Sequence, residues 1–442
     1  MHTWNRREVL ALAGALSLPA LAGCLGGLRS DAAGATPGLL LSNVDRETNP
    51  AVSEGDLDAQ VRANTQFALD VHHNRVAAAA GENLFVSPLS ISLAMAMVWA
   101  GSKGETETQI AETLHYAGEQ ADLHATFNRL DLALELPEGA DDEAFRLDIV
   151  NAIWGQESYP FSDNYLDTLA VNYGAGLRTL DFAGEPEPSR ATINDWVEDQ
   201  TEDKIVDLLP EGAITDLTRL VATNAVYFKA AWSLPFAEGA TGDATFTALD
   251  GTESTVPMMR HDEEFPYAEV DGVQVLELPY EGDAASMVVV LPAEGEFESV
   301  EESLDADGLH GLFDALEPRE GTVRLPKFTF GSKVALNDTL KALGMPDAFD
   351  HKLADFSGMV EPGTEERLAI TDVVHQSFVA VDEKGTEATA ATGVVVGDES
   401  APMDPFTFEA NRPFLFAIRH RETDSVVFLG RLVDAGAAQD TQ

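Results

Sequence analysis

The sequence predicts an α+β fold, in which most helices precede most strands along the chain. Apolar residues recur at helical spacing before residue 219. After residue 219, short segments rich in Val, Phe, Leu and Ile dominate, as is typical of β-strands. The chain shows no repeat of fixed period. Separated groups of helices and strands favour an α+β architecture over alternating βαβ units.

The first half of the chain predicts four helices. Val61, Ala68 and Val71 begin a helical apolar pattern that Gly81 ends. The segment 89–100 is apolar on nearly every side, so it must be buried. Ser87 and Pro88 before it suit a cap and a first helical turn. Two more amphipathic helices are predicted at 104–116 and 189–209.

The second half predicts five strands and one further helix. The helix covers 334–343 and is stopped by Gly344 and Pro346. No linker interrupts the chain after residue 59, so we expect one domain over 59–434 and a short tail over 435–442. The predicted strands are 220–228, 287–291, 323–330, 414–418 and 426–433.

The N-terminal segment looks like an export signal rather than part of the fold. Arg6 and Arg7 precede an apolar stretch that ends at Ala22, which resembles a twin-arginine signal. Leu21-Ala22-Gly23-Cys24 resembles a lipoprotein box, and Cys24 is the only cysteine of the chain. We therefore expect a signal peptide over 1–23, a lipid on Cys24 and a flexible tether over 24–58. The expected location is the outer face of the cell membrane, or outside the cell.

Composition excludes several classes of function. The chain has 442 residues, 76 Asp and Glu against 27 Lys and Arg, and a formal net charge of −49. So large a negative charge excludes unaided nucleic-acid binding, and one cysteine excludes a disulfide framework and a Cys-based metal site. Only 8 basic residues are Lys, and the acidic residues are spread along the whole chain. This pattern resembles proteins of salt-loving archaea. The alternative is that the acidic residues form a binding surface for a basic partner.

The sequence lacks a recognisable catalytic or cofactor motif. It has no Gly-x-Ser-x-Gly, no phosphate-binding Gly-Lys-Thr loop and no His-Glu-x-x-His. The ten histidines are scattered along the chain. We therefore expect no enzyme activity, no cofactor and no metal.

The segment 382–401 has an unusual composition. It contains small residues and then three valines, and no proline occurs before Pro402. At strand spacing Thr386, Ala388 and Ala390 share one face with Thr392 and two valines, and all are small or apolar. Proline is excluded from central strands, so its absence allows this segment to enter a sheet. A flexible surface loop of Ala, Thr and Gly is the alternative.

Several motifs resemble those of the serpins, the serine protease inhibitor family. Gly385-Thr386-Glu387-Ala388, led by Asp382-Glu383-Lys384, resembles the hinge of the serpin reactive-centre loop. Other similar segments occur in the family's order: 83–92, 101–106, 224–236, 325–328, 343–345, 354–358, 411–414 and 428–431.

The resemblance implies a serpin fold and a suicide inhibitor. Such a fold has a large central mixed β-sheet, further sheets, surrounding helices and an exposed reactive-centre loop, here at about 383–405. A serine protease attacks the loop, forms an acyl-enzyme, and is trapped when the cut loop inserts into the central sheet. The residues that the resemblance assigns to the hinge are Glu383, Gly385, Thr386, Glu387, Ala388 and Ala390. Those that it assigns to the sheet-opening region are Trp232, Asn224 and Ser87.

The position of the bait bond follows from the usual length of an inhibitory loop. Counting from Glu383 places it at Glu399-Ser400, although a bond beside Asp398 or Met403 is also open. An acidic bait suits a Glu-specific protease, and Met403 suits a subtilisin-like protease. The expected partners are therefore such a protease and the membrane, with the inhibitor acting as a monomer. A non-inhibitory serpin acting as a cell-surface binding protein is the first alternative, and a secreted hydrolase is the second.

Overall fold

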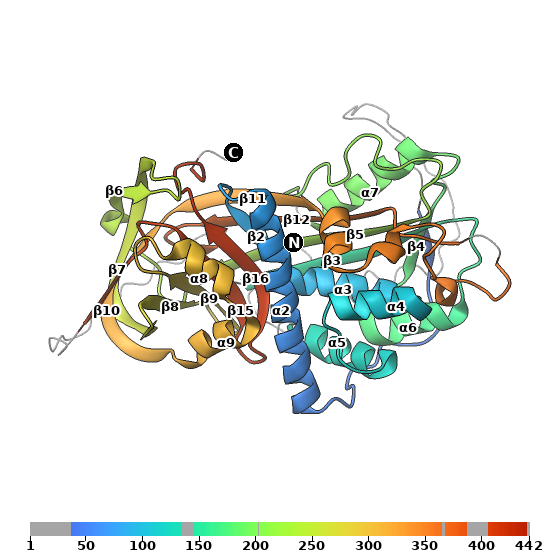
Figure 1. The fold of residues 1–442 in the computed structure, drawn as a ribbon, viewed down its shortest axis with the longest axis horizontal. Helices are drawn as coiled ribbons and strands as arrows, with labels where there is room; N and C mark the ends of the chain where they lie inside the picture. The colour runs from blue at the N-terminus through green and yellow to red at the C-terminus, as the bar shows by residue number, and fades with distance from the viewer. Residues whose placement is uncertain (1–36, 135–144, 202, 365–366, 387–404, 440–442) are drawn as a thin grey trace, which may run out of the picture. The chain divides into compact units, whose positions relative to one another are not determined.

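The computed structural model describes residues 37–134, 145–201, 203–364, 367–386 and 405–439 (Figure 1). These residues form two β-sheets with helices packed around them, which confirms the predicted α+β class. None of the described helices is long and apolar enough to cross a membrane.

The first sheet has seven strands and is mixed, with both parallel and antiparallel pairs. Its strand order is β1-β4-β3-β5-β13-β12-β11. Parallel pairs join β3 to β4 and β12 to β5, and the other pairs are antiparallel. The strands are β1 (Gly38–Leu40), β3 (Phe145–Gln156), β4 (Leu177–Leu180), β5 (Leu220–Ala231), β11 (Phe328–Ala335), β12 (Asp372–Val381) and β13 (Gly385–Thr386).

The second sheet contains nine strands. Its main path is β14-β10-β7-β8-β9-β15-β16-β2, and β6 pairs with β7. The strands are β2 (Leu84–Val86), β6 (Gly242–Thr247), β7 (Glu253–Val270), β8 (Val273–Pro279), β9 (Ala285–Leu291), β10 (Glu317–Pro326), β14 (Phe406–Glu409), β15 (Phe414–His420) and β16 (Ser425–Leu432).

The helices cover the two sheets, and one of them is wholly buried. Every residue of α3 (Pro88–Trp99) is buried, as its apolar sequence predicts, and it contacts both β5 and β16. The other α-helices of the described chain are α2 (Glu54–Ala78), α4 (Gly104–Thr113), α5 (Gln120–Leu134), α6 (Asp163–Tyr173), α7 (Pro186–Gln200), α8 (Phe297–Ser303), α9 (Ala306–Asp314) and α10 (Asn337–Leu343). Short 3₁₀ helices are η1 (Glu238–Ala240), η2 (Pro346–Phe349) and η3 (Ser357–Met359).

The main core lies between the sheets and α3. Leu89, Phe228 and Phe428 belong to it and are each at most 2% exposed. A separate cluster joins α7 to the outer face of the seven-stranded sheet, where Ile193 packs with Trp154. The seven-stranded sheet is therefore covered on both faces.

The prediction of one strand over 323–330 is wrong. The chain forms β10 up to Pro326 and β11 from Phe328, and these strands belong to different sheets. The backbone N–H of Lys327, between the two strands, still donates to the Pro257 carbonyl oxygen of β7 at 2.9 Å. Because Val323 and Leu325 precede Lys327, and Phe328 and Phe330 follow it, the apolar pattern does not mark the point where the chain passes from one sheet to the other.

Other predicted boundaries also differ. The helix predicted at 189–209 ends at Gln200, because Leu208 and Leu209 are buried in the core beneath α7 instead. The helix predicted at 334–343 begins only at Asn337, since Val334 and Ala335 still pair in β11.

Parts of the predicted tether and tail are packed against the domain. Residues 38–40 pair with β4, and α2 already begins at Glu54, which differs from a flexible tether as far as 58. In the tail, Ala438 is buried and its carbonyl oxygen accepts the Thr329 N–H at 2.7 Å. The remainder of the tether, up to residue 36, lies outside the described residues.

Candidate functional site: the split in the seven-stranded sheet

Strands β5 and β12 pair with each other at one end and are separated by β13 at the other. Residues 372–377 of β12 pair in parallel with residues 221–226 of β5. Beyond these pairs the two-residue strand β13 lies between them, antiparallel to both. Thr386 pairs with Val381 of β12 and with Ala230 of β5. The sheet therefore holds the first residues of an additional central strand, with its remaining length closed.

Gly385 is required where β13 enters the sheet. Its φ is +153°, and a Cβ atom at this position would lie 2.0 Å from the Ala230 carbonyl oxygen. A side chain would therefore push the entering strand away from β5. The chain turns into β13 through Asp382, whose backbone N–H donates to the Gly385 carbonyl oxygen at 3.0 Å.

Thr386 is held by Tyr280, whose ring stacks on that of Trp232. Its hydroxyl lies 2.9 Å from the hydroxyl of Tyr280, and the residue is 1% exposed. The Tyr280 ring stacks on Trp232 with centroids 4.6 Å apart. Trp232 binds the hinge directly, because its backbone N–H donates to the Lys384 carbonyl oxygen and its Nε1–H to that of Asp382. Trp232, predicted for the sheet-opening region, thus contacts the hinge.

Glu383 fixes the hinge through its side chain and its backbone. Its carboxylate accepts hydrogen bonds from Lys327 Nζ at 2.7 Å and from the Thr241 hydroxyl at 2.8 Å. Its carbonyl oxygen accepts the Phe236 N–H at 2.8 Å. Burial alone would raise the pKa of Glu383, but these hydrogen bonds outweigh burial and hold the pKa below its ordinary value. The hinge lead-in is therefore tied to both sheets.

A buried polar cluster lies where β5 and β12 are still paired. Asn224 of β5 stands opposite His375 of β12 in the parallel register. The Asn224 amide group donates to Ser90 Oγ of α3 and to Asn151 Oδ1 of β3, each at 2.5 Å. Ser87 N–H donates to His375 Nε2 at 3.0 Å. This polar cluster, consisting of Ser87, Ser90, Asn151, Asn224 and His375, links α3 to three strands of the sheet.

The partners of His375 fix its protonation. Nδ1–H donates to the Asn224 side-chain oxygen, and Nε2 accepts the Ser87 N–H, so the neutral imidazole satisfies both contacts. A second proton, on Nε2, would place two hydrogen-bond donors face to face and break the bond from the Ser87 N–H. Burial lowers the pKa of His375 to about 3.

Ser87 differs from its expected role as a helix cap. It occupies the N-cap position of α3, but its side chain makes no capping bond there. Its hydroxyl donates instead to the Val427 carbonyl oxygen of β16 at 2.7 Å. Ser87 therefore ties α3 to the second sheet while its N–H holds His375.

A family model described as Serpin (serine protease inhibitor) matches residues 62–435. The chain belongs to the serpin family. A serpin-like protein of Thermococcus kodakarensis is 38% identical over 437 residues, covering 97% of this chain and 99% of that protein. Human leukocyte elastase inhibitor is 39% identical over 379 residues, covering 84% of this chain and 97% of the inhibitor.

Solved serpin structures share the fold over most of the chain. The thermophilic serpin tengpin in its native state has a TM-score of 0.78 and 28% identity, covering 89% of this chain and 97% of tengpin. Human thyroxine-binding globulin has a TM-score of 0.77 and 28% identity, covering 86% and 99%. The predicted serpin fold is confirmed. Serpins include protease inhibitors and binding proteins such as thyroxine-binding globulin rather than enzymes, so the expectation that this chain is no enzyme agrees with its family.

The structure describes only part of the residues that the serpin resemblance assigns. At the end of the split Trp232 binds Asp382 and Lys384, the neighbours in sequence of Glu383 and Gly385. In the polar cluster Asn224 and Ser87 both bind His375. Five assigned residues lie outside the described residues, namely Glu387, Ala388, Ala390, Glu399 and Ser400, and so does Cys24 of the predicted lipoprotein box.

Sequence reasoning missed several residues of this serpin site. His375, Asn151 and Tyr280 carry no local signal because each is a single polar residue. His375 and Asn151 face their partners only through the strand register, and Tyr280, just after β8, does so through an isolated bridge to Trp232. Lys327 lies in a recognised motif, but its ion pair with Glu383 joins residues 56 positions apart.

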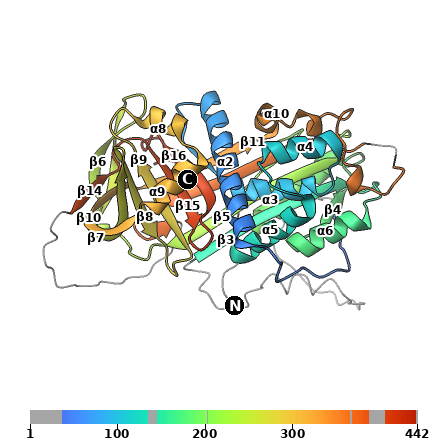
Figure 2. The same ribbon diagram turned by 60° about the horizontal axis from the view of Figure 1, so that its bottom comes forward.

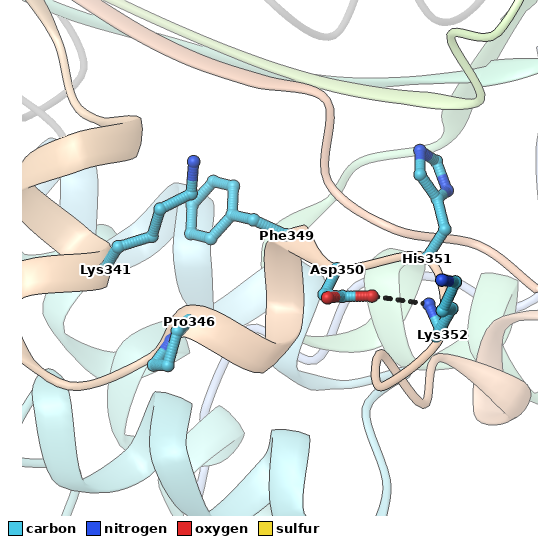
Figure 3. Close-up of a pocket in the computed structure, with 6 residues that line it drawn as sticks. All are labelled: Lys341, Pro346, Phe349, Asp350, His351 and Lys352. Atoms are coloured by element: carbon cyan, nitrogen blue, oxygen red, sulfur yellow. Dashed lines mark hydrogen bonds between the residues drawn. The ribbon is translucent and has the colours of Figure 1, made fainter.

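A surface pocket of about 480 Å³ lies apart from the split (Figure 3). It is lined by α10, η2 and the residues that follow, and Lys341 Nζ lies 5.0 Å from the centre of the Phe349 ring. None of the hinge or polar-cluster residues lines this pocket. Within the described ranges, no group of three His, Cys, Asp or Glu side chains is placed to hold a metal ion.

Proposed function

We propose that this serpin inhibits a serine-type endopeptidase as a suicide substrate. The observation that carries the proposal is the position of β13, which already lies between β5 and β12 and is antiparallel to both. A cleaved loop continuing from Thr386 would extend β13 along the same line. The inserted strand would then drag the acylated protease across the domain.

Insertion has to separate β5 from β12 over the pairs from Val221–Asp372 to Val226–Ser377. It also has to part Asn224 from His375 in the polar cluster. Each new backbone hydrogen bond contributes about 1 kcal/mol, while ordering each residue costs about 1–2 kcal/mol. Hydrogen bonds alone are therefore insufficient. Burial of the small face at Thr386, Ala388 and Ala390, with relief of strain in the sheet, must supply the rest.

The expected bait bond is Glu399-Ser400, and the expected target is a Glu-specific or subtilisin-like protease. The count from Glu383 supports this bond, and bonds beside Asp398 or Met403 are the other candidates. The identity of the bait decides which protease is trapped, because the residue before the bond enters the main specificity pocket of the protease.

We also propose that the inhibitor acts outside the cell in a saline environment. Arg6, Arg7 and Cys24 support export and lipid attachment, and the net charge of −49 supports adaptation to salt. An anchored inhibitor of this kind would protect the cell surface from the cell's own or its neighbours' secreted proteases.

Mixing the purified serpin with each protease in molar salt tests the mechanism. We expect a covalent complex that survives denaturing electrophoresis, together with a released C-terminal peptide. Mass spectrometry of that peptide identifies its first residue and hence the bait bond. Clean cleavage without a complex, across several proteases, would contradict inhibition and favour a non-inhibitory binding protein instead.

A matched pair of variants tests whether strand insertion is required. Ala388→Arg places a charge on the face of the loop that is predicted to become buried, whereas Thr389→Arg places the same charge on the opposite face. We expect A388R to be cleaved as a substrate, with the complex yield reduced at least about tenfold, and T389R to keep most of its inhibition. Equal yields from both variants would show that the predicted burial of this face is wrong.

A further inference from the structure

The segment before α2 carries an exposed apolar edge. We call it the leucine edge, and it consists of Leu39, Leu40, Leu41 and Val44, which are 36–47% exposed. Half of the exposed large apolar side chains of the described residues lie within positions 39–44. Such a concentration marks a surface that contacts something other than water.

The leucine edge includes the outermost strand of the seven-stranded sheet. Within the described residues β1 pairs with β4 alone, so its other side is open. An open, apolar edge strand attracts further strands and is usually covered or charged. The acidic residues nearest in sequence are Asp45 and Glu47, which follow the edge rather than interrupt it.

The leucine edge is held firmly against the domain. Arg46 forms an ion pair with Asp131 at 2.7 Å, and its Nε–H donates to Asn128 Oδ1 at 2.9 Å. Asn128 Nδ2 in turn donates to the Glu47 carbonyl oxygen, and the Glu47 N–H donates to the Val171 carbonyl oxygen. Helices α5 and α6 therefore present these side chains in fixed positions.

The place where the described chain begins favours a lipid surface as the partner. Cys24 lies thirteen residues before Pro37, so a lipid on Cys24 stays within about 45 Å of the leucine edge. The other end of the domain carries β14, the strand that follows the reactive-centre loop, and Figure 2 shows β14 and β4 at opposite ends. A membrane against the leucine edge would therefore leave the loop end facing outward.

We propose that the leucine edge rests on the interfacial region of the membrane to which the chain is tethered. The proposal rests on the proposed lipid attachment at Cys24 for its tether, but the contact itself is made by the leucines. The open backbone groups of β1 need water or headgroups as partners, so the contact stays at the interface and does not enter the hydrocarbon. The negative chain and anionic lipid repel each other, and this repulsion is screened as the Debye length falls from about 10 Å at 0.1 M to about 3 Å at 1 M salt.

Vesicle flotation tests this contact without the anchor. The mature-length Cys24→Ser protein, which cannot be lipidated, is floated with anionic phospholipid vesicles at rising salt. We expect the bound fraction to increase with salt, which is opposite to electrostatic adsorption. Leu39→Ser with Leu41→Ser should lower binding at least about fivefold. Val206→Ser with Leu234→Ser replaces two apolar side chains of similar exposed fraction elsewhere, and this control should bind like its parent.

Three results would overturn the proposal. The Cys24→Ser protein could fail to float at any salt, or the two pairs of substitutions could have equal effects. Sedimentation could instead show a dimer that only L39S/L41S dissociates, in which case a second copy of the chain covers the edge. Mass spectrometry of Cys24 tests lipid attachment, and formation of the protease complex tests inhibition. Because flotation tests the membrane contact on its own, failure of the contact is distinguishable from failure of either of these. Complex formation on vesicles should be as fast as in solution, because the loop end faces outward.

Discussion

At the scale of single residues, His375 makes the closed part of the sheet sensitive to acid. Burial lowers its folded-state pKa to about 3, below the ordinary value of about 6.5. Its contribution to stability is therefore complete above about pH 6.5 and is lost as the pH falls toward 3. Between pH 7.5 and 5 we expect His375 alone to remove about 2 kcal/mol from the free energy of unfolding. Denaturant unfolding at the two pH values, at constant salt, measures this loss.

The matched variant for this prediction is His375→Gln, which cannot take up the proton. His124 also has a pKa lowered by burial, to about 4, so the wild-type protein loses stability from more than one group. The expected result is that H375Q is less stable at neutral pH but loses about 2 kcal/mol less than wild type on acidification. An equal loss in both proteins would show that His375 does not titrate in this range.

Single residues of the site were predictable only where a local motif carries them. Gly385 and Thr386 follow from the hinge motif, and the structure shows that Gly385 is needed because Ala230 leaves no room for a Cβ atom. His375 was not predictable. Its function depends on Asn224, 151 positions away, and only the strand register brings the two together.

At the scale of elements, α7 is fastened to the seven-stranded sheet by a cation between two indole rings. Arg178 of β4 lies 4.6 Å from the ring centre of Trp196 on α7 and 5.5 Å from that of Trp154 on β3. Two cation–π contacts of about 0.5–1 kcal/mol each are lost in Arg178→Ala, so we expect unfolding to become easier by about 1–2 kcal/mol. Denaturant unfolding measures this loss, and a red shift of tryptophan emission should accompany it.

Arg178→Lys is the control and should recover part of the stability. A fully stable R178A would show that the apolar contacts of Ile193 and Val197 are sufficient to hold α7.

Elements were predictable where one property runs through a whole segment. The uniformly apolar sequence of α3 predicts a buried helix, and the structure has one. The segment 323–330 crosses from one sheet to the other at Lys327, and large apolar residues alternate with polar ones on both sides of the crossing, so the pattern does not reveal it. The N-terminal strand β1 is Gly- and Leu-containing and very short, so only its pairing with β4 distinguishes it from a tether.

At the scale of the whole molecule, the order of the serpin motifs predicts the fold, but not the state in which the sheet is found. That state depends on which strands pair: β13 with both neighbours at one end, and β5 with β12 at the other. The sequence of the hinge allows insertion in either case. The structure adds that Gly385 and Thr386 lie between β5 and β12, and that the polar cluster joins these two strands further along the same line, where they pair directly.

The net charge of −49 leads to the last prediction, which concerns the molecule as a whole. The 76 carboxylates outnumber the 27 basic residues, so the excess negative charges repel one another more in the folded chain than in an expanded one. Raising potassium chloride from about 0.1 to 1 M shortens the Debye length to about 3 Å, and the free energy of unfolding should rise by more than about 2 kcal/mol. Sucrose at equal osmolality is the control, since it stabilises by exclusion without screening charge. If sucrose stabilised the protein as much as salt, or salt had no effect, the carboxylates would not be limiting stability. A rise specific to salt would mean that screening of the carboxylates stabilises the folded chain, so the proposed inhibition should be measured at high salt.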